Sequence, residues 1–93
     1  MLYHLAIHDP RPGREQDVLD SMHRFGAAAK SQPGLVEVHT FKDVQSNIMV
    51  GFGVWESMEA LHAARPALAA ATEGDRFDEW EDEPPTVYLL EEV

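Results

Sequence analysis

The side chains best suited to acid–base chemistry in this chain are His4, His39 and Glu37. An imidazole changes its charge near neutral pH, so either histidine can take a proton from a weakly acidic phenol or enol. Glu37 stands two residues before His39 and shares its face on an extended strand, as a second base or an orienting group. We expect His39 or His4 to be the catalytic base. The alternative is that these polar groups hydrogen-bond across a dimer interface.

The space for a substrate is predicted beside the strand that ends at Trp55. Alternation places Gly51, Gly53 and Trp55 on one face of this strand, so two positions without a side chain lie next to a large indole. The strands that carry His4 and His39 should flank it, with the glycines leaving a pocket between the two imidazoles. Trp55 is then either a stacking platform for a planar substrate or an anchor of a dimer interface.

An alternative to acid–base catalysis is that His4, Glu37 and His39 bind a metal ion, because two histidines and a carboxylate form a known ligand set. Residues two apart on a strand are separated by about 6.6 Å, and the two histidine strands by about 9.6 Å, so convergence on one ion would be strained. The absence of cysteine excludes disulfides, thiolate nucleophiles and cysteine-ligated metals. We expect no metal and no cofactor.

Strands and helices alternate along the chain in the order βαββαβ. This is the ferredoxin-like α+β plan, with a four-stranded antiparallel sheet and both helices on one face. A chain of 93 residues suits one domain, which we expect to span residues 1–93. The predicted strands are Leu2–His8, Leu35–Lys42, Ile48–Trp55 and Thr86–Glu91, and the first helix lies within Arg14–Ser31.

The second helix should begin after Ser57, whose hydroxyl can accept a hydrogen bond from the first helical turn. Pro66 lacks the N–H that a continuing helix needs, so a kink or a restart is expected there, with the new piece ending near Gly74. Phe77 and Trp80, three residues apart, predict a short helical turn tethered to the body of the protein.

We expect the helices to cover the more uniformly aliphatic face of the sheet. That face is predicted to carry Tyr3, Leu5, Ile7, Val36, Val38, Ile48, Val50, Phe52, Val54, Val87 and Leu89. The helix-free face would then carry His4, His8, Glu37, His39, Phe41, Met49, Gly51, Gly53, Trp55, Tyr88 and Leu90. Such a face is too aromatic to stay in water. A second copy should cover it, which predicts a homodimer shaped as a closed barrel.

The net charge of −10 comes almost entirely from the end of the chain, where residues 73–93 hold nine acidic residues and one basic residue. We interpret Asp75–Glu83 as a solvated surface segment. Without a basic stripe the protein should bind neither nucleic acid nor an anionic membrane. No run of about 18 apolar residues predicts a membrane span, and no signal peptide is recognisable, so a cytoplasmic protein is expected.

Three motifs resemble one known family. They are Arg-Pro-Gly-Arg-Glu at residues 11–15, Gln-Pro-Gly-Leu-Val-Glu-Val at residues 32–38 and Val-Trp-Glu-Ser-Met-Glu-Ala-Leu-His at residues 54–62. Over Leu2–Ala70 the chain is similar to the antibiotic biosynthesis monooxygenases, a family of dimeric α/β barrels. The resemblance implies oxidation of a small phenolic or quinol-type substrate by O₂ without metal or flavin. It also implies that Trp55 takes part in the chemistry, while Gly51 stands where an asparagine is expected.

The substrate-binding residues that we expect around this chemistry are Glu37, Phe41, Gly51, Gly53, Tyr88 and Arg65. Two other functions remain open: a non-catalytic dimer that binds a small molecule or another protein, and an isomerase or lyase that uses histidine without a cofactor. The haem-degrading relatives require an asparagine, a tryptophan and a histidine where this chain has His4, a position near Arg65, and Asp75. We therefore do not expect haem degradation.

Overall fold

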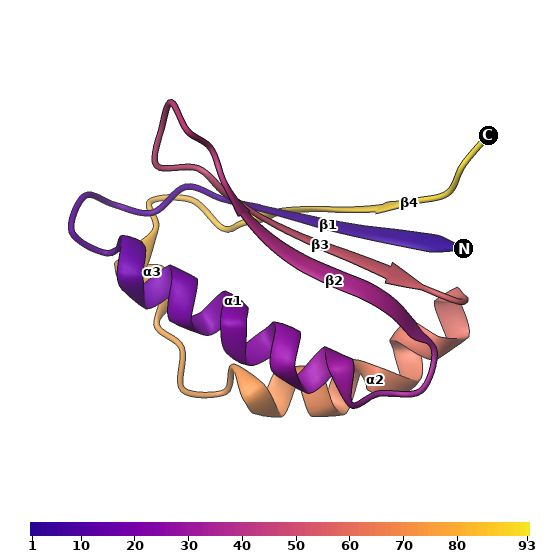
Figure 1. Cartoon of the computed structure of the whole chain (residues 1–93). Helices are drawn as coiled ribbons and strands as arrows, with labels where there is room; N and C mark the ends of the chain where they lie inside the picture. Colours follow the sequence, from indigo (N-terminus) through magenta and orange to yellow (C-terminus); the bar gives the residue numbers. More distant parts are fainter.

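The computed structural model describes all 93 residues, as an antiparallel four-stranded sheet with helices packed on one face only (Figure 1). The strand order is β2-β3-β1-β4, so β3 lies between the strands that carry His39 and His4. The predicted βαββαβ order and the α+β class are confirmed. The elements are β1 (Leu2–His8), α1 (Glu15–Lys30), β2 (Leu35–Lys42), β3 (Met49–Trp55), α2 (Met58–Ala71), α3 (Phe77–Trp80) and β4 (Thr86–Leu90).

The junction between β3 and α2 forms as its sequence predicts. The Ser57 side chain accepts a hydrogen bond from the Ala60 backbone N–H at 3.1 Å, which satisfies one free donor of the first turn. Gly34 lies against this turn with φ of 89°, and a Cβ there would stand 2.5 Å from that of Ala60. Only glycine fits this position. The expected restart at Pro66 is wrong, because α2 continues through Pro66 as one helix.

The face assignment of β1 and β3 is wrong. In the sheet, His4 pairs with Gly53, and Leu2 pairs with Trp55. Trp55 is only 1% exposed and packs with residues of α1 and α2. The residues that share the Trp55 side of β3, and the residues paired with them on β1, therefore face the helices. The prediction had the two faces of these strands reversed. The helix-covered face carries His4, His8, Met49, Gly51, Gly53 and Trp55, and the helix-free face carries Tyr3, Leu5, Ile7, Val50, Phe52 and Val54.

For β2 and β4 the assignment is right, apart from Val36. Val38 lies opposite Gly53 on the covered face, and Val87 lies opposite Ala6 there. A β-bulge between Leu35 and Glu37 interrupts the pairing of β2 with β3. Val36 is consequently 48% exposed instead of being covered by a helix.

The helix-free face is a continuous aromatic and aliphatic surface. Phe52 stacks on Tyr3 with ring centroids 6.2 Å apart and on His39 with centroids 6.4 Å apart. At its edges Phe41 is 53% exposed and Tyr88 is 48% exposed. Nothing in the single chain covers this surface (Figure 1).

The acidic segment Asp75–Glu83 is only partly the solvated surface that we expected. The Asp75 carboxylate accepts hydrogen bonds from Ser21 and Arg24 of α1, and its side chain is 5% exposed. Glu81 is 3% exposed and contacts the end of β1. These two acids fasten the segment between α2 and β4 to the body of the protein. No helix of the chain is long and apolar enough to cross a membrane.

Candidate functional site

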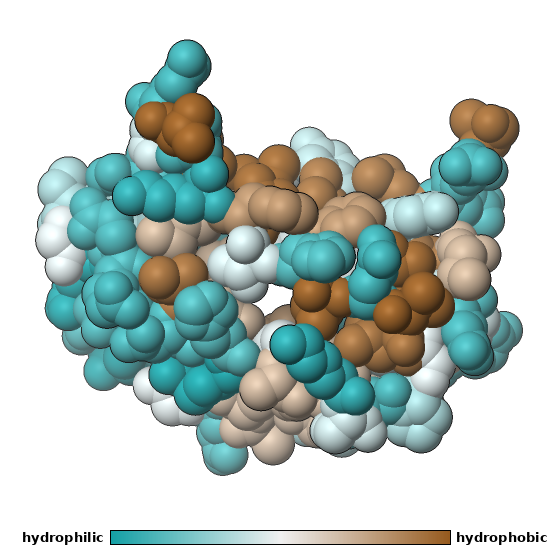
Figure 2. Space-filling view, in the orientation of Figure 1, coloured by the Kyte–Doolittle hydropathy of each residue, from teal (hydrophilic) through white to brown (hydrophobic).

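A cavity of about 320 Å³ lies between the sheet and the helices, and it appears as an opening in the middle of the surface in Figure 2. Its sheet side is lined by small residues of the two central strands, namely Ala6, Gly51 and Gly53. A larger side chain at these positions would fill the layer. The glycine gaps on β3 therefore leave space as predicted, but on the helix-covered face of the sheet.

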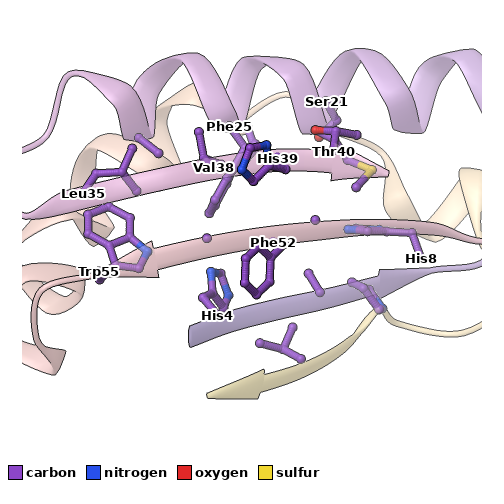
Figure 3. Close-up of a pocket in the computed structure, with 18 of the residues that line it drawn as sticks. His4, His8, Ser21, Phe25, Leu35, Val38, His39, Thr40, Phe52 and Trp55 are labelled. Atoms are coloured by element: carbon purple, nitrogen blue, oxygen red, sulfur yellow. The ribbon is translucent and has the colours of Figure 1, made fainter. Parts of the chain in front are cut away.

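Trp55 forms one end of this cavity, with its ring held in the main hydrophobic core (Figure 3). A Cβ built on Gly53 would stand 3.3 Å from the indole Nε1, so Gly53 leaves this nitrogen uncovered. The indole N–H donates to no protein acceptor, and because no buried side-chain nitrogen or oxygen lacks a partner, this nitrogen is accessible from the cavity. A buried N–H normally finds a partner, so this donor is free for an oxygen atom of a bound molecule.

His4 and Arg65 line the same cavity from β1 and α2. Burial lowers the pKa of His4 below its usual value of 6.5, and the positive charge of Arg65 lowers this pKa further. His4 is therefore neutral at pH 7. Arg65 is exposed at the cavity and has no carboxylate partner, whereas every other arginine forms a salt bridge: Arg11, Arg14, Arg24 and Arg76.

His8 lines the cavity toward the end opposite Trp55 (Figure 3). Its Nδ1 lies 3.0 Å from the Oε2 atom of Glu81, and its ring stacks on Phe77 with centroids 5.5 Å apart. Sequence reasoning missed this pair as functional residues. The alternation that singled out His4 also places His8 on its face, but no local pattern connects His8 to Glu81, which lies 73 residues away.

Of the residues predicted for the site, the structure brings His4, Gly51, Gly53, Trp55 and Arg65 together around one cavity. His39 touches this cavity, but it pairs with Phe52 and lies on the other face of the sheet, where half of its side chain is exposed.

The remaining predicted residues do not line the cavity. Glu37 approaches His39 at 3.9 Å on the helix-free face, and Phe41 stacks on His39 there with ring centroids 5.7 Å apart. Tyr88 pairs with Leu5 on that same face.

The two histidines considered for a metal lie on opposite faces of the sheet, since His4 pairs with Gly53 while His39 pairs with Phe52. No group of three or more histidine, aspartate or glutamate side chains is arranged to hold a metal ion. The cavity offers a hydrogen-bond donor, the neutral imidazole of His4 and one unpaired guanidinium, which together can bind and ionise a small polar aromatic molecule.

Solved structures identify the fold. The chain superposes on Rv0793 from Mycobacterium tuberculosis with a TM-score of 0.86 and 17% identity, covering 99% of this chain and 94% of that chain. It superposes on an antibiotic biosynthesis monooxygenase with a TM-score of 0.82 and 18% identity, covering 100% and 99%. The chain has the antibiotic biosynthesis monooxygenase fold.

A third structure with this fold is SnoaB from Streptomyces nogalater, a cofactor-independent oxygenase. Its TM-score is 0.80 and its identity 15%, with 99% of this chain and 92% of that chain covered. No protein-family model matches the sequence, and no curated protein matches it either. At these identities the likeness establishes the fold alone.

Proposed function

We propose that this protein is a cofactor-independent monooxygenase that oxidises a small phenolic or quinol-type molecule in the cavity between its sheet and helices. One observation carries the proposal: the free indole N–H of buried Trp55 opens into the same cavity as His4 and the unpaired Arg65. A protein donor, a neutral imidazole and a cation suit a planar molecule that bears oxygen atoms and becomes an anion.

The proposed reaction requires the protein only to ionise the substrate and to shield it from water. A cavity imidazole accepts the substrate's hydroxyl proton, and the electron-rich anion gives one electron to O₂. The radical pair then combines, forming a C–O bond and a peroxide that takes up a proton. Loss of the remaining hydrogen from that carbon breaks the O–O bond, so one oxygen atom stays as a quinone carbonyl and the other leaves as water.

Arg65 has a specific part in this scheme. Its charge has no carboxylate partner, so it is free to stabilise the oxyanion that forms when the substrate loses its proton. The overall charge of −10 would otherwise repel an anion, which makes a single unpaired cation at the cavity decisive for binding. The name of SnoaB, a cofactor-independent oxygenase of the same fold, supports the same class of reaction.

We also infer that the working form is a homodimer that buries the helix-free face. The aromatic surface around Phe52, with half-exposed Phe41 and Tyr88, is a contiguous apolar face of the kind that monomers rarely leave in water. The substrate cavity lies on the opposite side of the sheet. Dimerisation therefore stabilises the sheet that forms the cavity wall and leaves the opening accessible.

Oxygen consumption tests the proposed reaction. A panel of quinols and anthrones is added to the protein with a metal chelator present, and O₂ uptake is recorded above the rate of autoxidation. We expect Trp55→Phe to raise the KM by about tenfold, because it keeps the ring and removes the N–H donor. Tight binding of panel members without any O₂ uptake would instead favour the non-catalytic binding protein. Conversion without O₂ uptake would favour the isomerase or lyase.

A further inference from the structure

We propose that His8, oriented by Glu81, is the general base of the cavity and removes the hydroxyl proton of the bound phenol. This inference rests on the proposed function, because it supplies the first proton transfer of that reaction. It assigns the base to the end of the cavity opposite Trp55 instead of to His4 or to His39.

The hydrogen bonds of Glu81 determine which nitrogen of His8 is available. One carboxylate oxygen of Glu81 lies 3.0 Å from His8 Nδ1, and the other accepts the Asp9 backbone N–H at 2.8 Å. As a carboxylate Glu81 can only accept hydrogen bonds, so Nδ1 of His8 carries the hydrogen. The lone pair of Nε2 is then free to accept a proton.

The surroundings of His8 hold this imidazole in one orientation. His8 is 7% exposed and Glu81 is 3% exposed, so the bond between their side chains is sheltered from water. Phe77 stacks on the imidazole ring, and the ring lines the cavity (Figure 3). A preorganised base that needs no rearrangement lowers the barrier for proton transfer.

Charge distinguishes His8 from His4 as the base. A base becomes positive when it accepts a proton, and the negative charge of Glu81 stabilises that imidazolium. His4 instead faces the positive charge of Arg65, which opposes its protonation. His4 is thus better suited to hydrogen-bond the substrate in its neutral form.

The proton transfer is balanced within the cavity. The O–H bond of the phenol breaks, an N–H bond forms at Nε2 of His8, and the electron pair stays on the phenolate oxygen. The resulting phenolate and imidazolium have opposite charges, and the carboxylate of Glu81 lies behind His8. O₂ then accepts the electron, as in the proposed reaction. His8 is the catalytic residue, and Glu81 is a positioning residue.

A coloured phenol tests this assignment without any oxidation. p-Nitrophenol and a nitronaphthol are titrated with the protein at fixed pH, and phenolate absorbance reports ionisation while ligand-detected NMR reports binding. We expect wild type to raise the phenolate fraction of the bound probe. His8→Gln should abolish that rise while the probe still binds, and His23→Gln, which changes an exposed histidine of α1, should leave it unchanged.

Turnover separates the roles of the two residues. On a quinol that wild type oxidises, His8→Gln should lower kcat by about 10²- to 10⁴-fold with little change in KM. Glu81→Gln should lower kcat by about tenfold or more. In the wild-type protein, long-range ¹⁵N–¹H NMR should find the His8 proton on Nδ1, a readout that needs no variant to fold.

Each result decides between the two proposals. A proton on Nε2 of neutral His8, or full probe ionisation in a folded His8→Gln variant, overturns the assignment of the base and leaves the proposed oxygenase standing. Probe ionisation that depends on His8, without O₂ uptake on any quinol, supports the base and overturns the oxygenase. Failure of both phenols to bind overturns the phenolic substrate class, and the assignment of His8 falls with it.

Discussion

Gly53 leaves the indole nitrogen of Trp55 open to the cavity, since a Cβ on Gly53 would stand 3.3 Å from Nε1. Gly53→Ala should therefore cover the N–H donor and weaken binding of a phenolic ligand by about tenfold, the worth of one hydrogen bond. Gly51→Ala is the matched control on the same strand and face. Its new Cβ would come closest to the flexible Met22 methyl, at 3.4 Å, and would cover no hydrogen-bond donor, so its effect on the Kd should be much smaller. A Kd of Gly53→Ala equal to that of wild type would place the ligand elsewhere.

The aromatic helix-free face predicts that Phe41→Arg dissociates the protein into monomers. Phe41 is half exposed in the single chain, and a guanidinium buried without a partner at a dimer interface is strongly unfavourable. We expect the dimer dissociation constant to rise at least about hundredfold in sedimentation experiments. Val44→Arg introduces the same charge in the hairpin loop, at a residue that is 96% exposed, and should leave the dimer intact. A folded wild-type monomer at micromolar concentration would contradict the dimer.

The pKa of His4 should rise in Arg65→Gln, because this substitution removes the second of the two causes that lower it. Burial, the larger cause, remains, so the pKa of His4 should stay below 6.5. An NMR titration of the His4 imidazole measures both values, with Arg76→Gln as the surface control. A pKa of His4 that is unchanged by Arg65→Gln would mean that Arg65 does not face this imidazole.

The lowered pKa of His4 also predicts how the stability of the protein depends on pH. Below pH 6.5 the unfolded chain protonates His4 more readily than the folded chain does, so the free energy of unfolding should fall on acidification. Above that pH this contribution is constant. His4→Gln should remove this part of the acid sensitivity in urea titrations between neutral pH and pH 5, while His62→Gln, on the exposed surface of α2, should retain it.

The Asp75 carboxylate should contribute measurably to stability, because it is 5% exposed and is bonded by both Ser21 and Arg24. Asp75→Asn should lower the free energy of unfolding by about 1–3 kcal/mol, the usual cost of losing a buried charge-assisted hydrogen bond. Asp78→Asn is the control, since Asp78 is an exposed acid paired only with exposed Arg76. Similar urea midpoints for both variants would show that Asp75 does not anchor this segment.

Strand limits and topology were readable from the sequence because each strand alternates cleanly. Leu2–His8 and Leu35–Lys42 form strands with the predicted limits, and Ser57 caps α2 as expected. Alternation separates two faces but does not say which one the helices cover. In β1 and β3 we assigned the aliphatic face to the helices, whereas the helix layer holds the cavity and needs Ala6, Gly51 and Gly53.

The site was predictable only in part. The two glycines and Trp55 indicated a cavity beside β3, and Arg65 was expected at its rim, where the structure places it. The sequence did not single out Glu81, because it belongs to an acidic segment whose composition is typical of a solvated surface. Its burial depends on α3, which brings Phe77 onto His8 and Glu81 to the end of β1. That contact joins distant parts of the chain and leaves no local pattern.

The central claim is that the cavity transfers one oxygen atom from O₂ to a phenolic carbon. The most direct measurement is turnover of a responsive quinol or anthrone under isotopically labelled dioxygen, with a metal chelator present, followed by mass spectrometry of the product. We predict that the quinone carries one labelled oxygen atom and that the second label appears in water. An unlabelled product, or labelled hydrogen peroxide formed in equal amount to the product, would contradict the claim.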